Sequence, residues 1–188
     1  MQTTSHFIGL KLNSSKFVDL FVELQKYLDE HELEDSIVLQ NILSLHITLY
    51  YLDSHLDKYE RLRLLQDIAK VSSNGLPTIA KLEVGYFGES TKERVCYLGC
   101  RPNDTATVLN EFFTKQYQYS HIPENQLAFV PHISLFRIKD PMAYAEHKTK
   151  IDSLIGEAIT TIDYDNLVEN LHLFQVNSLY NPEIQIPV

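Results

Sequence analysis

The sequence predicts an α+β fold in which two βαβαβ lobes are related by a pseudo-twofold axis, with antiparallel sheets that face a central cleft and helices outside. Apolar residues recur alternately with the period of strands and the period of helices along the 188 residues. The order of these elements occurs twice, and no Pro- or Ser-rich linker separates the two halves. We therefore expect one bilobal domain over residues 1–188, with one lobe at about residues 6–87 and the other at about 94–177.

The first half of the chain reads as strand, helix, strand, helix and strand. Its predicted strands are the apolar runs at residues 6–12, 45–52 and 77–87. Ser14 is expected to cap the first helix, because a serine side chain can accept a bond from an N–H group that lacks a helical partner. The apolar stripe of this helix is formed by Phe17, Leu20, Phe21, Leu24 and Leu28. Ser54 is expected to cap the second helix, whose buried face would carry Leu62, Leu65 and Ala69.

The second half repeats this order of elements. Its predicted strands are residues 94–100, 131–138 and 167–177. The first of its helices begins at Asp104 and carries Val108, Phe112 and Phe113. The second begins at Asp140 and Pro141, since proline suits the first helical position, where its missing N–H group costs nothing. The buried face of this helix is formed by Ile151, Leu154 and Ile155.

The composition excludes several classes of protein. The 25 acidic residues outnumber the 16 basic ones, and the resulting net charge of −9 opposes extended contact with a nucleic-acid backbone. A nucleotide or the end of an RNA strand fits this charge better. No apolar run approaches the roughly 20 residues of a membrane span, and the first residues lack the basic and apolar regions of a secretion signal. We therefore expect a cytoplasmic monomer that does not bind membranes.

The two cysteines are consistent with that compartment. Cys96 and Cys100 lie in one predicted strand, where a rise of about 3.3 Å per residue separates them by roughly 13 Å. A disulfide needs Cα atoms within about 7 Å of each other. We therefore expect two free thiols in a reducing environment.

The clearest functional signal is a five-residue motif that occurs once in each half. Residues 46–50 read His-Ile-Thr-Leu-Tyr, and residues 132–136 read His-Ile-Ser-Leu-Phe. Because side chains alternate along a strand, the histidine, hydroxyl and aromatic residues of each motif are expected to share a face. Ser54 and Asp140 each lie eight residues after a motif histidine, which supports a true repeat. One such motif is common, whereas two in matched positions point to a site.

The two motifs together suit acid–base chemistry on a phosphate. One imidazole, of His46 or His132, can accept a proton while the other donates one. The hydroxyls of Thr48 and Ser134 can donate hydrogen bonds to the phosphate oxygens and stabilise the charge that develops there. These residues predict a metal-independent reaction on a phosphodiester or a cyclic phosphate, and we expect no cofactor.

Tyr50 and Phe136 end the two motifs, and their rings would either stack on the substrate's nucleobase or ribose or pack in the core.

Two competing chemistries fit the sequence less well. Catalytic zinc usually takes three protein ligands, and neither motif adds a second histidine or a carboxylate on its face. A serine nucleophile is disfavoured because no Gly-x-Ser-x-Gly sequence surrounds Ser134.

These residues resemble the two-histidine phosphoesterase superfamily, which includes the bacterial 2′-5′ RNA ligase-like proteins and RNA cyclic phosphodiesterases. The similarity lies in LHITL and PHISL, in the segment FVPHISLFR, and in the first and last strands FIGLKL and NLHLFQVNS. It implies a bilobal α+β fold and hydrolysis of 2′,3′-cyclic or 2′-5′ phosphodiesters at RNA or nucleotide ends. His46 and His132 would be the acid–base pair, and Thr48 and Ser134 would hold the phosphate.

Arg137 matches an arginine that often follows the second motif in this superfamily, which implies a contact with the substrate. Its position in the strand places it on the opposite face from His132, so that this role requires a bulge in the strand. The chain departs from the superfamily pattern at Ser134, where threonine is commoner, and at His6, where many relatives carry arginine or an aromatic residue.

Two functions remain open from the sequence. The chain is either a cyclic phosphodiesterase or a noncatalytic module of the same fold that binds a nucleotide or an RNA end. The segments before the two motifs, at about residues 31–44 and 118–129, are expected to form the rims of the cleft. Product formation from a 2′,3′-cyclic nucleotide in EDTA would distinguish the two functions, because a binding module would give saturable binding alone.

Overall fold

The computed structural model describes residues 5–52, 56–88, 94–101, 104–119, 122–178 and 181–185. The strands in these residues are β1 (Ser5–Leu12), β2 (Ile37–Leu39), β3 (His46–Leu52), β4 (Lys81–Phe87), β5 (Val95–Arg101), β6 (His132–Ile138), β7 (Val168–Ser178) and β8 (Asn181–Gln185). The α-helices are α1 (Val18–Glu30), α2 (Lys58–Ser72), α3 (Asp104–Gln116) and α4 (Pro141–Thr161). Three short 3-10 turns are η1 (Ser14–Phe17), η2 (Ile42–Ser44) and η3 (Pro123–Gln126).

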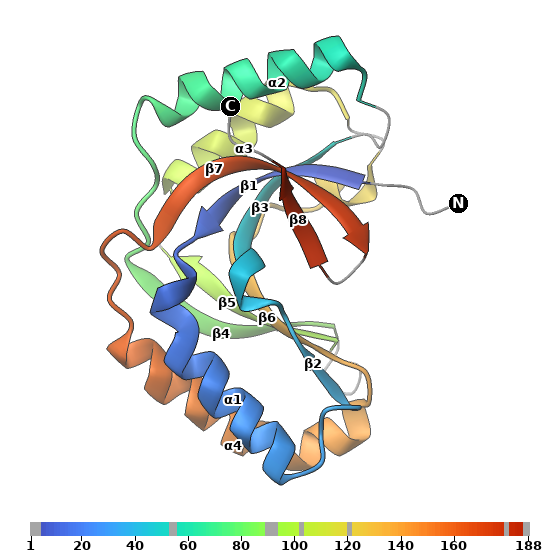
Figure 1. Cartoon of the computed structure of the whole chain (residues 1–188), viewed down its shortest axis with the longest axis vertical. Helices are drawn as coiled ribbons and strands as arrows, with labels where there is room; N and C mark the ends of the chain where they lie inside the picture. Colours follow the sequence, from blue (N-terminus) through green and yellow to red (C-terminus); the bar gives the residue numbers. More distant parts are fainter. Residues whose placement is uncertain are drawn as a thin grey trace.

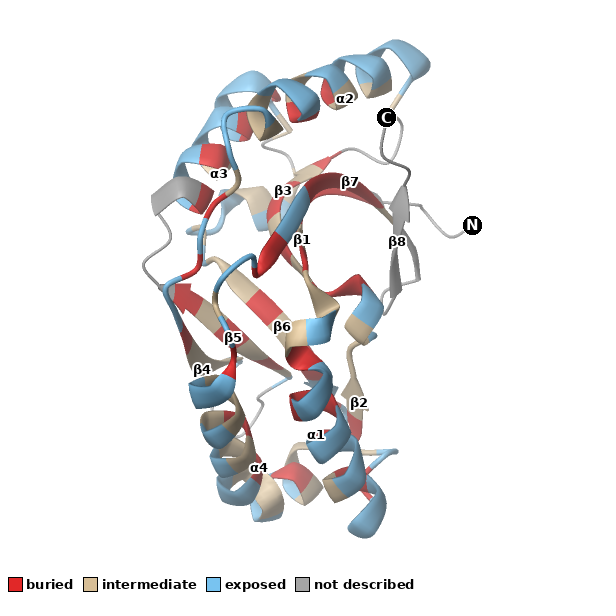
Figure 2. Ribbon diagram, turned by 60° about the vertical axis from the view of Figure 1, so that its left-hand side comes forward, coloured by how far each residue is buried: buried red, intermediate tan, exposed pale blue. Residues whose placement is uncertain are grey.

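The strands form two antiparallel sheets, which lie between two pairs of helices. The first sheet has the order β3-β1-β7-β8, and the second has the order β2-β6-β5-β4. Figure 1 shows α2 and α3 on the outer side of the first sheet, and α1 and α4 on the outer side of the second. Buried residues concentrate on the strands, and exposed residues on the outer faces of the helices (Figure 2). The predicted α+β class is therefore confirmed.

The sheets do not coincide with the two halves of the chain, so the predicted lobe boundaries at residues 6–87 and 94–177 are wrong. β4, at the end of the first half, pairs with β5 of the second half, and β7 pairs with β1. Each sheet thus takes one strand of the repeat from the other half. The repeat itself is preserved, because the order β3-β1-β7 corresponds to β6-β5-β4. Periodicity identifies strands but does not identify their partners.

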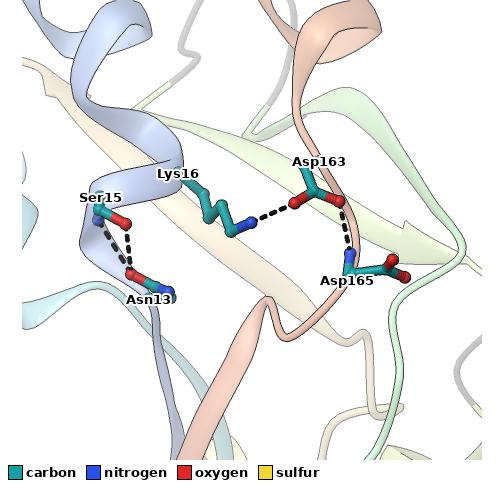
Figure 3. Close-up of polar contacts among 5 residues, drawn as sticks. All are labelled: Asn13, Ser15, Lys16, Asp163 and Asp165. Atoms are coloured by element: carbon teal, nitrogen blue, oxygen red, sulfur yellow. Dashed lines mark hydrogen bonds and ion pairs between the residues drawn. The ribbon is translucent and has the colours of Figure 1, made fainter.

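The first helical segment is capped by Asn13 rather than by Ser14. Asn13 Oδ1 accepts hydrogen bonds from Ser15 N at 3.2 Å and from Ser15 Oγ at 2.7 Å. The turn η1 follows and leads into α1. Figure 3 shows that Lys16 of η1 forms an ion pair with Asp163, in the loop between α4 and β7. The ion pair thus joins the start of this segment to the loop that leads back into the first sheet.

The cap of α2 is Asp57, and the predicted cap, Ser54, lies outside the described residues. Asp57 Oδ1 accepts from Tyr59 N at 2.7 Å and from Glu60 N at 2.8 Å, and Glu60 Oε2 accepts from Asp57 N at 3.1 Å. This reciprocal capping box sets the start of the helix. The eight-residue spacing between motif and cap therefore holds only for Asp140, whose side chain caps α4 as predicted.

Two helices turn a different face to the core from the one predicted. α2 buries Leu64 and Ile68, whereas Leu62 is 49% exposed. In α3, Phe113 is buried as predicted, but Val108 is 61% exposed. Each of these helices carries two overlapping apolar stripes, and periodicity alone does not determine which one packs against the sheet.

The predicted state of the cysteines is confirmed. Cys96 and Cys100 are buried, and neither forms a disulfide. Both lie on the core side of β5, where they are 0% and 1% exposed. In the described residues, no helix combines the length and the apolar character that crossing a membrane requires.

Candidate active site

β3 contains a bulge directly after its histidine and threonine. Ile8 of β1 lies opposite Tyr50, and the next residue, Gly9, lies opposite Thr48. Leu49 is therefore an extra residue with no partner in β1. Because an insertion of one residue reverses the side-chain alternation, the residues after Leu49 lie on the opposite face from the one predicted.

β6 contains the same bulge at the equivalent position. Cys96 of β5 lies opposite Phe136, and Tyr97 lies opposite Ser134, so Leu135 is the extra residue. In both strands the half-buried histidine and hydroxyl residues are followed by two consecutive buried residues. The repeat detected in the sequence thus extends to the irregularity of the backbone.

The bulges place Tyr50 and Phe136 in the core, so the prediction that they share the histidine face is wrong. Tyr50 is 2% exposed, and Phe136 is 1% exposed. The Tyr50 hydroxyl donates to Tyr117 O and accepts a bond from Tyr119 N at 3.1 Å. The Phe136 ring packs against that of Tyr144, with 6.0 Å between the centroids. Of the two readings that the sequence left open for these rings, packing in the core is the correct one.

Tyr51 lies beside Thr48, and Arg137 lies beside Ser134, in the lining of one pocket. The sequence predicted these places for Tyr50 and Phe136. Burial raises the pKa of Tyr51, and a hydrogen bond with the Thr48 side chain and the charge of Arg137 act in the opposite direction. The bulge brings Arg137 to the same face as His132. Sequence reasoning missed Tyr51, because the only signal was two adjacent tyrosines, and the choice between them depends on the bulge.

Groups outside the strand pairs satisfy the carbonyl groups of both bulged leucines. Asn110 Nδ2 of α3 donates to Leu49 O at 2.7 Å. At the equivalent position, Gln40 N, directly after β2, donates to Leu135 O at 2.7 Å. A buried carbonyl without a partner would destabilise the fold. These bonds therefore help to hold the strand geometry on which the histidine face depends.

The two motif histidines are fixed in the same tautomer. His46 Nδ1 lies 2.7 Å from Ser44 O, and His132 Nδ1 lies 2.7 Å from Val130 O. A carbonyl oxygen only accepts hydrogen bonds, so each Nδ1 carries a proton and donates it. Each Nε2 is therefore left for proton transfer to or from a ligand. In both motifs the acceptor is the carbonyl two residues before the histidine, as the repeat requires.

Both imidazoles favour the neutral state. The pKa of His46 is lowered to about 4, chiefly by burial and to a smaller extent by the charge of His132, while the bond to Ser44 O acts in the opposite direction. Burial also lowers the pKa of His132, partly offset by its bond to Val130 O. A positive charge on His132 disfavours protonation of His46. A ligand with a negative charge would raise both pKa values.

Aromatic rings fix the position of His46 over the first sheet. Its ring centroid lies 4.7 Å from that of Phe7 and 5.0 Å from that of Phe174. The two phenylalanine rings stack on each other at 4.7 Å with an interplanar angle of 4°. They cover Gly9, where a Cβ atom would come within 3.2 Å of either ring. The glycine therefore makes room for the rings that hold the histidine.

The second sheet holds His132 in a similar way. The His132 ring centroid lies 4.7 Å from that of Phe87 and 5.3 Å from that of Tyr97. Phe87 and Tyr97 stack at 4.2 Å with an interplanar angle of 27°. Here too the aromatic pair lies beside a glycine, Gly85, which is directly opposite Tyr97. Each sheet thus uses an aromatic pair and a glycine to position its motif histidine.

A pocket of about 430 Å³ lies between the sheets and brings together residues of both motifs. Thr48 and Tyr51 line it from β3, and His132, Ser134 and Arg137 line it from β6. His46 does not line the pocket in this structure, although it lies on the same strand face as Thr48. We call this space the motif pocket. Four of the residues expected at the site therefore meet here, and His46 lies two residues before Thr48 on β3.

The loop around η3 forms one wall of the motif pocket. Residues 124, 125 and 127–130 line it, which agrees with the rim expected at residues 118–129. The rim expected at residues 31–44 contributes no lining residue. Asn125 joins η3 to the edge of β3, because it accepts a bond from Tyr51 N at 3.0 Å and donates one to Tyr51 O at 2.8 Å. In the described residues, no group of three or more His, Cys, Asp or Glu residues is placed to hold a metal ion.

The fold is shared with several solved structures. TT0787 of Thermus thermophilus superposes with a TM-score of 0.65 and 18% identity, over 96% of this chain and 93% of that one. Escherichia coli LigT complexed with NADP+ gives a TM-score of 0.53 and 18% identity, over 97% and 94% of the two chains. LigT complexed with 3′-AMP gives a TM-score of 0.52 and 16% identity, over 97% and 93%.

Comparison of the sequence with family models gives a match over nearly the whole chain. Residues 4–184 match the model of the AKAP7 2′5′ RNA ligase-like domain. No curated protein shows significant similarity to the sequence. The resemblance to the two-histidine phosphoesterase superfamily is confirmed by the family model together with the shared fold. The chain belongs to the family of AKAP7 2′5′ RNA ligase-like domains.

Proposed function

We propose that this protein is a metal-independent phosphodiesterase that hydrolyses 2′,3′-cyclic phosphates or 2′-5′ phosphodiesters of RNA ends or nucleotides. One observation carries the proposal: His46 and His132 occupy equivalent places on two sheets, and each uses Nδ1 for a carbonyl bond and leaves Nε2 for a ligand. Two imidazoles in this arrangement suit a reaction that removes one proton and delivers another. Membership of the family supports the same reaction class.

The proposed reaction on a cyclic phosphate needs water and the two histidines. Nε2 of the neutral histidine takes a proton from a water molecule as the water oxygen forms a bond to phosphorus. Nε2 of the protonated histidine gives its proton to the 2′ or 3′ ribose oxygen as the bond from that oxygen to phosphorus breaks. The product is a phosphate monoester with a free ribose hydroxyl. Proton exchange with solvent then restores both histidines.

Three further side chains would hold the phosphate during this reaction. Thr48 and Ser134 line the motif pocket and offer hydroxyl donors to the nonbridging oxygens. Arg137 lines the same pocket and offers a positive charge. The negative charge of the bound phosphate would also raise the lowered histidine pKa values, so that binding itself favours the protonated acid.

The net charge of the chain and the ligands of structurally similar proteins support the proposed substrate class. The net charge of −9 opposes binding along an extended nucleic acid but tolerates a single phosphate held by local groups. Structures of LigT contain NADP+ and 3′-AMP, which favours a nucleotide or an RNA end as the ligand of the motif pocket in this chain. We propose the same ligand class here.

The test is hydrolysis of a 2′,3′-cyclic nucleotide in the presence of EDTA. We expect turnover by the wild type, and a loss of at least about 10²-fold in His46→Ala and in His132→Ala, the scale of a missing general acid or base. His147→Ala is the control, because His147 lies on α4 and bonds to Tyr27 on the outer side of the second sheet. Saturable binding without product in the wild type would instead identify a binding module.

A further inference from the structure

The motif pocket has room for more than a phosphate group. Its volume of about 430 Å³ lies in the range of pockets that hold small ligands. The groups assigned above to the phosphate come from β3 and β6, whereas much of the remaining lining comes from α3 and from the loop around η3. This second part, here called the loop wall, consists of Asn110, Thr114, Glu124, Asn125 and residues 127–130. A nucleoside that extends from the phosphate can contact this wall.

The loop wall offers apolar surface to the flat faces of a base. Leu127 is 73% exposed and Val130 is 41% exposed, and the Phe129 ring is half-buried. Large apolar side chains in contact with water favour a ligand that covers them. Aromatic rings stack on every base, because every base has a flat face. These three side chains can therefore hold a base without selecting one.

The polar side chains of the loop wall have few donors to offer to a base. Thr114 Oγ1 donates its only hydroxyl proton to Asn110 O at 2.8 Å. Asn125 Nδ2 donates to Tyr51 O at 2.8 Å and to Tyr119 O at 3.1 Å, so both of its N–H groups are engaged. The Asn110 amide uses one of its two N–H groups on the bulge carbonyl of β3. The edge of a base therefore meets mainly side-chain acceptors on this wall.

Glu124 is the charged acceptor of the loop wall. An ionised carboxylate accepts hydrogen bonds on two oxygens and donates none. Glu124 lies in η3, and the next residue, Asn125, bonds to both the N–H and the carbonyl group of Tyr51. The backbone that carries Glu124 is thus attached to the edge of the strand that carries Thr48. A ligand edge with two adjacent N–H donors would match this carboxylate best.

Guanine is the common RNA base that offers two adjacent N–H donors, at N1 and N2. In adenine and cytosine the amino group lies beside a ring nitrogen that accepts hydrogen bonds, and its lone pair would face the carboxylate unfavourably. In uracil the N3–H group lies between two carbonyl oxygens. A site that hydrogen-bonds a pair of donors rejects an analogue that lacks them, because its own polar group is then left unpaired.

We propose that the motif pocket selects guanine, with the Glu124 carboxylate accepting hydrogen bonds from the N1–H and N2–H groups of the base. This inference rests on the proposed function, because it takes the phosphate to lie at the motif hydroxyls and the nucleoside to extend from it to the loop wall. The faces of the base pack on Leu127 and Phe129, and Arg137 stays with the phosphate. Glu124 is therefore the residue that determines the base preference.

Hydrolysis of the 2′,3′-cyclic phosphates of guanosine, adenosine, cytidine and uridine tests this selection. We expect kcat/KM to be highest for the guanosine compound, and about tenfold or more above the value for adenosine, the scale of a charge-assisted pair of hydrogen bonds. Glu124→Gln keeps the length of the side chain but puts an amide N–H group in place of one acceptor oxygen. The guanosine-to-adenosine ratio should fall by about tenfold in this variant. A preference for another base in the wild type, or a ratio that Glu124→Gln leaves unchanged, would overturn the inference.

A matched control and a binding measurement complete the test. Glu146→Gln makes the same chemical change at an exposed position of α4, on the outer side of the second sheet (Figure 1), and the ratio should stay at the wild-type value. If the wild type hydrolyses none of these compounds, the proposed function fails, and calorimetry with GMP and AMP then tests the base selection alone. GMP should bind about tenfold more tightly than AMP, and Glu124→Gln should abolish the difference. Equal affinities for GMP and AMP in the wild type would overturn the inference.

Discussion

The Tyr97 ring lies across Gly85 so closely that a Cβ atom at Gly85 would come within 2.5 Å of Tyr97 Cζ. No side chain fits at residue 85 while the ring keeps this position. The ring is also stacked on Phe87 and touches His132. A change at Gly85 should therefore reach the catalytic histidine proposed above through a single aromatic side chain.

We predict that Gly85→Ala lowers the free energy of unfolding by about 1–3 kcal/mol, the usual cost of overpacking. The penalty should disappear in a Tyr97→Ala background, because the three atoms nearest to a Cβ atom at Gly85 all belong to the Tyr97 side chain. Chemical denaturation of the four proteins of this double-mutant cycle measures the coupling. Gly99→Ala, on the neighbouring strand, should unfold like the wild type. Additive effects of the two substitutions would contradict the contact.

Loss of the hydroxyl group should lower stability at Tyr50 and catalytic activity at Tyr51, although the two residues are adjacent. Tyr50→Phe leaves Tyr117 O and Tyr119 N without their buried partner, which should cost about 1–3 kcal/mol of stability. Its turnover of a cyclic nucleotide should stay near that of the wild type. Tyr51→Phe removes a hydrogen bond to Thr48 and should lower kcat by about tenfold, with little change in melting temperature. The reverse pattern would show that the bulge in β3 is misplaced.

The pH dependence of kcat/KM should reflect two lowered histidine pKa values. The reaction needs one neutral and one protonated imidazole, and both groups titrate below the ordinary value of 6.5 in the free protein, with His46 at about 4. The profile of kcat/KM should therefore peak below pH 6.5 and fall as pH rises. The limbs of kcat should lie at higher pH, because the bound phosphate favours imidazolium. The two apparent pKa values of each profile belong to the pair of histidines rather than to either residue.

A maximum of kcat/KM above pH 7 would contradict this assignment. A series of substrates with different leaving groups would then separate the two histidines, since loss of the acid harms poor leaving groups most. Chelation by EDTA should leave the profile unchanged, because both proton transfers are assigned to imidazoles.

Stability should fall in acid for the same reason. Burial lowers the pKa values of His6, His46, His132 and His172. The unfolded chain, with ordinary values near 6.5, binds protons before the folded one does. The stabilisation is thus fully present above about pH 6.5 and is lost as pH falls from there toward the folded values. Denaturation midpoints at pH 7.5 and pH 5 measure the loss.

His46 should contribute most clearly to that acid sensitivity. A shift from 6.5 to about 4 corresponds to about 3 kcal/mol once the pH is below both values. His46→Asn keeps a donor for the Ser44 carbonyl but does not titrate, so the difference between the two pH values should be smaller in this variant. An equal pH dependence in both proteins would show that His46 is not buried as a neutral ring.

The order of the elements and the main residues of the candidate site could be predicted from the sequence. The features that depend on how the strands pair could not. The alternation in LHITL correctly placed His46 and Thr48 on one face, because strand periodicity is local. It failed at Tyr50, because a bulge adds one residue and leaves no mark in composition. Only the partner strand, in which Gly9 follows Ile8 without a gap, reveals it. Arg137 was assigned to the wrong face for the same reason.

Other features depend on which strands become neighbours. Gly99 lies opposite His132 and lines a pocket of about 290 Å³, but nothing in the segment RVCYLGC indicates which strand lies beside it. Helix starts were missed where a neighbouring residue offered a better cap, as Asp57 does with Glu60 in a capping box. The sequence repeat thus correctly predicted which elements are equivalent, but it did not predict how these elements assemble into sheets.

The exchange of β4 and β7 makes the two halves of the chain interdependent. The first half alone would contain β4 without a partner strand, and the second half alone would contain β7 without β1. Neither half could complete a sheet, so severing the connection between Gly88 and Arg94 should leave two fragments that are ordered only when mixed. Contacts between distant parts of the chain must form before either histidine reaches its place, which favours slow folding. Although the sequence consists of two similar halves, the protein therefore folds as a single unit.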